Sequence, residues 1–268
     1  MFEKYISFLS GFTKDSEVPF PCPACGRTTL EISSDSIIKQ ETVASIKNQE
    51  EDFDIETIEE VYKGIFICMN KKCNEQIYHV GKSSYDWEYF DYIEIDGYAS
   101  PSRREPFSYM VPEYITPFIK YFDIPNKAPN EIVNALNEAF KLTPTSYSAA
   151  ANKVRIAVEI LCSIFGIEAR RENGSFIVLN KRLESIKEEN GLYPFKTKLT
   201  AIKWLGNAGS HEEDDVDIYS LFDSFEIIKS ILDGLYNKSD RVDQLAEFVI
   251  ENKGILTPLQ RRIIKKAP

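Results

Sequence analysis

The chain has 268 residues, of which 43% are hydrophobic and 28% are charged, and its formal net charge is −10. A chain of this length and composition can form two modest domains, each with its own hydrophobic core. The negative charge argues against a protein that coats nucleic acid through bulk electrostatics, although it leaves room for a local basic cleft. No uncharged apolar run approaches the roughly 20 residues needed to cross a membrane, so we expect no membrane partner.

The first ten residues predict a short amphipathic helix rather than an export signal. Glu3 and Lys4 interrupt the apolar stretch that a signal peptide needs. We therefore expect a cytoplasmic protein, in which thiols stay reduced and paired cysteines favour a metal over a disulfide.

Two cysteine pairs predict a zinc site. Cys22 and Cys25 form a Cys-x2-Cys knuckle, and Cys68 and Cys73 form a second pair with four residues between them. Four thiolates make a closed tetrahedral zinc site, which is structural because no coordination position is left for a substrate. Two alternatives remain: the cysteines are unrelated free thiols, or His79 replaces one of the ligands.

The segments around these cysteines predict a β-rich zinc-ribbon domain over residues 1–100. Strands are expected at 28–38, 61–68 and 76–80. The aromatic, alternating segment 78–98 predicts two or three more strands, whose side chains either form a core and a protein-binding face or stack on nucleic-acid bases.

Six prolines between residues 101 and 129 indicate a proline-rich linker over 101–128. From 129 to 268 the hydrophobic period is that of helices. Helices are expected at 132–140, 147–167, 179–186, 203–211 and 218–235, with two shorter ones before a basic tail (Arg261, Arg262, Lys265 and Lys266). The predicted fold class is therefore α+β, a β-rich zinc-ribbon domain followed by an all-α helical bundle.

Three polar residues, Lys203, Asn207 and His211, are spaced four apart. On a helix this spacing places them on one stripe, within about 80° of arc. The residues between them, such as Gly206, are small, which lets a ligand or another backbone approach the stripe.

A second polar pair, Arg155 and Glu159, lies on the otherwise apolar helix at 147–167. Charges in such a place need partners, because burying them alone is costly. We expect the pair to face the stripe that begins at Lys203. The alternative is a buried ion pair with no further role.

The Arg155-x3-Glu159 helix followed by Trp204-Leu205-Gly206-Asn207-x3-His211 resembles domain-of-unknown-function family 4145 over about residues 129–235. That family is grouped with HEPN-type domains, helical bundles that dimerise and recur in toxin–antitoxin, CRISPR and anti-phage systems. Active HEPN members are metal-independent ribonucleases. The resemblance implies that His211 is the motif histidine and Asn207 the polar residue before it, while Lys203 stands where the family usually has arginine.

Together these interpretations predict a ribonuclease toxin of a bacterial anti-phage system that acts on RNA as a homo-oligomer. His211 would act as general acid or base with Asn207 orienting it or the phosphate, while Lys203 and Arg155 would stabilise phosphoryl oxygens and Glu159 would hold Arg155. The zinc domain would sense a phage protein or another partner, or drive oligomerisation. The alternative is a non-catalytic adaptor whose zinc domain binds protein or nucleic acid and whose bundle dimerises; a DNA-binding regulator has less support, because no candidate recognition helix is basic.

Overall fold

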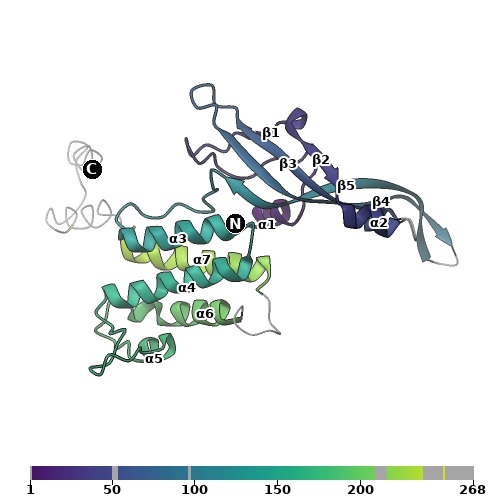
Figure 1. The fold of residues 1–268 in the computed structure, drawn as a ribbon. Helices are drawn as coiled ribbons and strands as arrows, with labels where there is room; N and C mark the ends of the chain where they lie inside the picture. The colour runs from purple at the N-terminus through teal and green to yellow at the C-terminus, as the bar shows by residue number, and fades with distance from the viewer. Residues whose placement is uncertain (1, 50–53, 96–97, 209–215, 238–249, 251–268) are drawn as a thin grey trace.

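An antiparallel sheet and a helical bundle lie beside each other in the computed structural model (Figure 1), which describes residues 2–49, 54–95, 98–208, 216–237 and 250. The sheet and the cysteines belong to the N-terminal part of the chain, and the helices follow. The predicted α+β class, β-rich first and all-helical afterwards, is confirmed. Among the described residues no helix is long and apolar enough to cross a membrane.

The sheet has five antiparallel strands in the order β1-β3-β4-β5, and β2 pairs with β3 beside β1. Helix α2 (Val43–Gln49) and three-residue 3-10 turns at Ser34–Ser36 and Ile55–Thr57 connect the first strands. The strands are β1 (Leu30–Ile32), β2 (Ile38–Glu41), β3 (Glu59–Cys68), β4 (Gln76–Ile95) and β5 (Tyr98–Thr116).

Two predictions about this sheet were wrong in detail. The segment expected to form one strand at 28–38 is broken, because a 3-10 turn separates β1 from β2. The proline-rich linker expected at 101–128 is strand β5 as far as Thr116. β5 tolerates its prolines because it is the edge strand, where a missing N–H costs little, and Pro112 lies at a register shift opposite Gly81.

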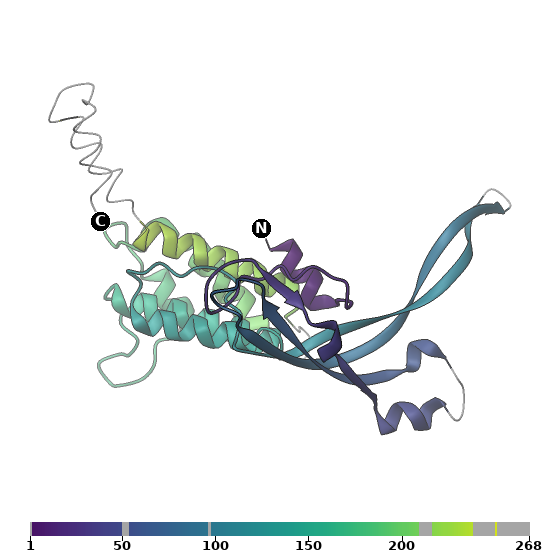
Figure 2. The same cartoon turned by 90° about the horizontal axis from the view of Figure 1, so that it is seen from above.

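β4 and β5 extend well beyond the other strands. Pairing between β3 and β4 ends at Glu59 and Ser84, whereas pairing between β4 and β5 continues to Ile95 and Tyr98. We call the two-stranded part, Tyr85–Ile95 with Tyr98–Ser108, the arm. Figures 1 and 2 show it projecting away from the helical bundle. The segment 78–98, predicted to form two or three strands, therefore belongs to one long strand, β4, as far as Ile95, and Tyr98 begins β5.

One face of the sheet, the inner face, packs against helix α1 (Glu3–Ser10) and the loop that follows it. Phe8 and Phe12 stack with ring centroids 4.4 Å apart and lie over Phe66 of β3. The helix predicted at the N-terminus is thus confirmed. It also reaches the bundle, because the Phe2 ring lies 5.3 Å from that of Phe222.

The bundle is built around α4, which contacts α3, α6 and α7 and buries residues on most of its sides. Gly166, with φ +76°, follows its C-terminus as predicted. The helices are α3 (Asn130–Leu142), α4 (Tyr147–Ile164), α5 (Leu179–Glu184), α6 (Lys196–Ala208) and α7 (Ile218–Tyr236), with a 3-10 turn at Tyr193–Phe195 before α6. The two shorter helices and basic tail predicted after α7 lie outside the described residues, apart from residue 250.

Candidate metal centre and candidate active site

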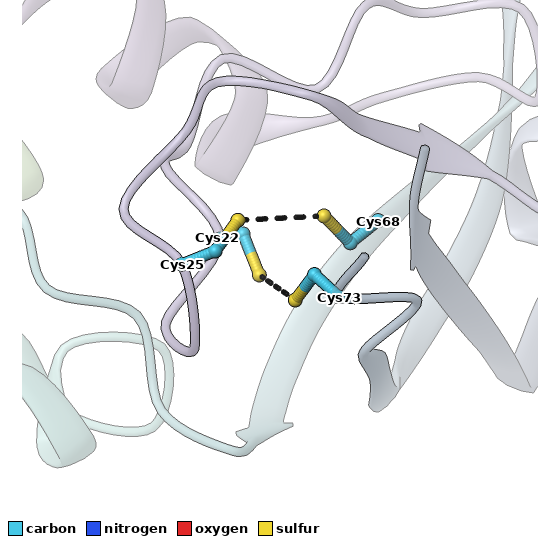
Figure 3. Close-up of side chains that lie close together, drawn as sticks. All are labelled: Cys22, Cys25, Cys68 and Cys73. Atoms are coloured by element: carbon cyan, nitrogen blue, oxygen red, sulfur yellow. Dashed lines mark hydrogen bonds between the residues drawn. The ribbon is translucent and has the colours of Figure 1, made fainter. Parts of the chain in front are cut away.

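The four predicted metal ligands converge at one point (Figure 3). Cys22 and Cys25 lie on the loop between α1 and β1, Cys68 ends β3, and Cys73 lies in the turn before β4. Their sulfur atoms all lie within 4.8 Å of one another, with 3.8 Å between Cys22 and Cys73 and 3.7 Å between Cys25 and Cys68. Four sulfurs around a zinc ion at about 2.3 Å are about 3.8 Å apart, whereas a disulfide brings two sulfurs to about 2.0 Å. The four cysteines therefore form one cluster, whose geometry fits a tetrahedral metal site.

Each pair of cysteines lies in or next to a backbone turn, and the two turns are similar. Gly26 has φ +70° and donates its N–H to the carbonyl of Cys22, and Asn74 has φ 52° and donates to the carbonyl of Asn70. The backbone N–H of Arg27, followed by the Asn70 side chain, lowers the pKa of the Cys25 thiol. These donors favour the thiolate of Cys25, which is the form that binds a metal, whereas burial raises the pKa of the Cys22 thiol.

His79, the alternative ligand, belongs to the core of the sheet rather than to the cluster. It lies in β4 as predicted, its ring stacks on Phe66 with centroids 3.9 Å apart, and its Nδ1 lies 3.3 Å from the hydroxyl of Tyr62. The group of candidate ligands in the described part of the chain consists of the four cysteines.

The predicted pair on α4 forms an ion pair that stays partly exposed. Arg155 Nη2 lies 3.2 Å from Glu159 Oε1, and the two side chains are 28% and 37% exposed. Arg155 also lies against α6, because a Cβ atom added to Gly206 would come within 2.9 Å of Arg155 Cβ. The small residue predicted to allow a close approach is thus in contact with the predicted arginine.

Lys203 lies on α6, as Gly206 does, but its amine points toward α5. Its Nζ donates a hydrogen bond to Asn180 Oδ1 at 3.0 Å and lies 3.5 Å from the centre of the Trp204 ring. The residue is only 7% exposed, while Trp204 covers it from the solvent side and is 63% exposed. Sequence reasoning missed Asn180, since nothing in the pattern of a short helix marks one amide as a partner of a distant lysine.

The remaining two candidates are less completely described. Asn207 lies in α6, but its side chain is not among the described parts of the chain, and His211 lies outside the described residues altogether. The structure therefore brings together Arg155, Glu159 and the α6 backbone at Gly206, and the catalytic roles stay predictions.

A further buried cation, Arg182 of α5, was not predicted. Its Nη2 donates to the hydroxyl of Ser163 at 2.8 Å and to the carbonyl of Ile167 at 2.9 Å. A guanidinium near the C-terminus of α4 opposes the negative end of the helix dipole, and here it also satisfies the carbonyl of Ile167, which follows the helix. Arg182 therefore fixes α5 to the end of α4 and needs no part in the candidate site.

Comparisons with known proteins locate two family regions. Residues 137–253 match the family described as Domain of unknown function (DUF4145), and residues 10–108 match the family described as Domain of unknown function (DUF8608). Comparison with curated proteins and with solved structures finds no match. The first family is the one that the helical segment resembles, and neither description mentions a HEPN fold. The residues that match DUF8608 include the cysteine cluster and most of the sheet, and the residues that match DUF4145 include helices α4 to α7.

Proposed function

We propose that the chain is a metal-independent, HEPN-like endoribonuclease whose site is built on α4 and α6. The observation that carries the proposal is the contact between Arg155 and Gly206. It puts the aliphatic part of the Arg155 side chain, whose guanidinium pairs with Glu159, beside the residue that immediately precedes Asn207. One further helical turn along the sequence would bring His211 onto the same stripe.

In this mechanism the RNA supplies its own nucleophile, the 2′-hydroxyl. His211, whose ordinary pKa is about 6.5, takes that proton or gives one to the departing 5′-oxygen. Arg155 stabilises the charge that develops on the phosphoryl oxygens, and the products carry a 2′,3′-cyclic phosphate. DNA lacks the 2′-hydroxyl and is not cleaved.

The metal in the cysteine cluster is zinc in this proposal, and its role is structural. The donor set of four thiolates suits zinc, and the observed sulfur spacing fits its bond length. All four positions would be taken by protein, so the ion would take no part in cleavage.

The biological setting proposed is a cytoplasmic toxin of a bacterial anti-phage system. A ribonuclease that acted freely would harm its own cell, so the zinc-bearing region would restrain the bundle until it meets a phage protein, or would assemble the chain into an oligomer. The sheet and bundle share one core, which gives such a signal a physical route.

The test compares the wild type with His211→Ala and Arg155→Ala on matched RNA and DNA strands. We expect the wild type to give 2′,3′-cyclic phosphate ends on RNA alone, and each substitution to slow cleavage by about 100-fold or more. Thr197→Ala is the matched control, because Thr197 is exposed on the same helix. The second measurement is the growth of cells that express each variant, with and without phage challenge. In these cells the phage supplies the trigger that is missing from an assay of purified protein. Equal cleavage, or equal toxicity, for wild type and His211→Ala would contradict the proposal.

A second function, a non-catalytic adaptor, is favoured by the position of Lys203. Its amine is already engaged by Asn180 and covered by Trp204, so it is not free to meet a phosphate. An adaptor would leave RNA intact and would lack toxicity under phage challenge, while remaining folded and metal-loaded. The same experiment therefore separates the two functions.

A further inference from the structure

The face of the sheet opposite α1, which we call the outer face, carries an apolar groove of about 480 Å³. Large side chains line it and remain exposed in the described part of the chain: Ile38 by 55%, Tyr78 by 52%, Val80 by 38% and Tyr114 by 55%. Contiguous exposed apolar surface of this kind usually marks a binding site.

The groove also carries a positive charge. Lys63 lines it and is exposed, and no acidic partner of Lys63 is found among the described residues. Lys82, the next lysine along this face, is paired with Glu113 at 3.4 Å. An occupant that is apolar and acidic would suit this surface.

The arm is the second feature, and in the described part of the chain it is packed at its base, where Lys39 contacts Tyr85 and Ser108. Beyond Ser84 it consists of β4 and β5 alone, and an isolated two-stranded ribbon is at best marginally stable in water. Its described outer-face pairs are Asp86 with Phe107, Glu88 with Glu105, and Phe90 with Arg103. Arg103 is ion-paired with Glu105, so the net negative charge of this surface comes from Asp86 and Glu88, which lie beside Phe90 and Phe107. This combination of apolar and acidic side chains complements the groove.

The groove and this side of the arm belong to one continuous face. Along a strand, alternate residues point to the same side, so Tyr78 and Val80 of the groove share a face with Glu88 and Phe90 of the arm. At the register shift between β4 and β5 the extra residue is Glu113 of β5. The side chains of β4 therefore keep alternating between the two faces of the sheet.

We propose that a second copy of this chain covers both features at once. If two copies pack outer face to outer face about a two-fold axis perpendicular to the strands, the strands of one run opposite to those of the other. The arm of each copy then lies in the groove of its partner, as an isologous interface requires. Sheets packed in this way lie about 10 Å apart. The inference rests on the oligomerisation part of the proposed function and deepens it, and it is independent of RNA cleavage.

The first measurement is the mass of the purified full-length protein in solution over a concentration series, by light scattering after size exclusion. We expect the wild type to have twice the chain mass of 30.7 kDa. An arm variant, Phe90→Glu, and a groove variant, Val80→Glu, should each weaken the dimer at least about tenfold. Val178→Glu is the control, because Val178 is equally apolar and is exposed before α5. Circular dichroism and metal content verify that each variant is folded.

The second measurement mixes the two weakened variants. In a mixed dimer the arm of the groove variant and the groove of the arm variant are both intact, so one of the two contacts is restored. We therefore expect the mixture to dimerise more tightly than either variant alone. Arms that packed only on arms would give no such recovery.

The inference is overturned if the wild type is monomeric over the whole series, or if both variants dimerise as tightly as the wild type. The second result would place the interface elsewhere, for example on the helical bundle. A wild type that stays monomeric until another protein is added would assign the groove to that protein instead. None of these results bears on cleavage, which is measured separately with His211→Ala.

Discussion

His79 is an imidazole enclosed by aromatic rings on the inner face of the sheet. It lies between Phe12, Tyr62 and Phe66, and its Nε2 is buried with no hydrogen-bond partner in the described structure. Burial lowers the pKa of His79 to about 4. The folded protein therefore holds this side chain neutral over the whole physiological range.

The stability of the protein should depend on pH through this residue. An unfolded histidine titrates near pH 6.5, so between about 6.5 and 4 the unfolded chain binds the proton and the folded chain does not. The free energy of unfolding should then fall as pH decreases through that window, by at most about 1.4 kcal/mol per pH unit. Urea unfolding at pH 7 and pH 5 measures the fall.

The matched variants are His79→Leu and His211→Ala, since these are the two histidines of the chain. His79→Leu should flatten the pH dependence between pH 7 and 5, whatever it does to stability at pH 7. His211→Ala should retain the dependence. An unchanged slope in His79→Leu would show that burial of His79 does not set it.

Between elements, the closest approach in the candidate site is that of α4 and α6 at Gly206. A side chain there would meet Arg155 Cβ at 2.9 Å and the carbonyl oxygen of Ala151 at 3.4 Å. The Cβ atom of Arg155 is fixed by the backbone of α4, so it cannot move aside as the end of a long side chain can. The two helices pack at this distance only because residue 206 has no Cβ.

Gly206→Ala should therefore destabilise the bundle even though alanine is the better helix former. The gain in helix propensity is about 1 kcal/mol, while overpacking at a tight contact costs roughly 1–3 kcal/mol. We expect a lower melting temperature, and slower RNA cleavage if the proposed site is correct. Thr197→Ala on the exposed face of α6 gains propensity without the clash, and it should be neutral or stabilising. A Gly206→Ala protein as stable as Thr197→Ala would refute the close contact.

The elements that could be predicted are those whose pattern is local. The helical period marks α3, α4 and α7 within a few residues, and the spacing of the cysteines follows from what zinc requires. β5 could not be predicted, because its prolines are tolerated only through its place at the edge of the sheet. Asn180 and Arg182 were missed for a similar reason, since their partners lie on other elements and leave no periodic trace.

Across the whole molecule, one continuous core joins the sheet to the bundle. The connection passes through aromatic rings at the N-terminus. Phe20, two residues before Cys22, lies 5.1 Å from Tyr5 of α1 and 5.9 Å from Tyr121. Tyr121 in turn lies 5.3 Å from Phe222 of α7. The loop that carries Cys22 is therefore packed, within a few contacts, against the helices.

Removal of the zinc proposed for this cluster should consequently affect the whole chain. Zinc bound by four cysteines contributes on the order of 10 kcal/mol, which is comparable to the entire stability of a typical domain. Without it the loop would release Phe20 from the shared core, so the loss would reach Tyr121 and α7. Calorimetry with and without a chelator should show one transition that shifts to lower temperature as a unit, and Cys22→Ser should behave like the chelated protein. Cys162→Ala, in the core of α4, should keep the metal content of the wild type. A separate bundle transition that the chelator does not move would mean that the two halves fold independently.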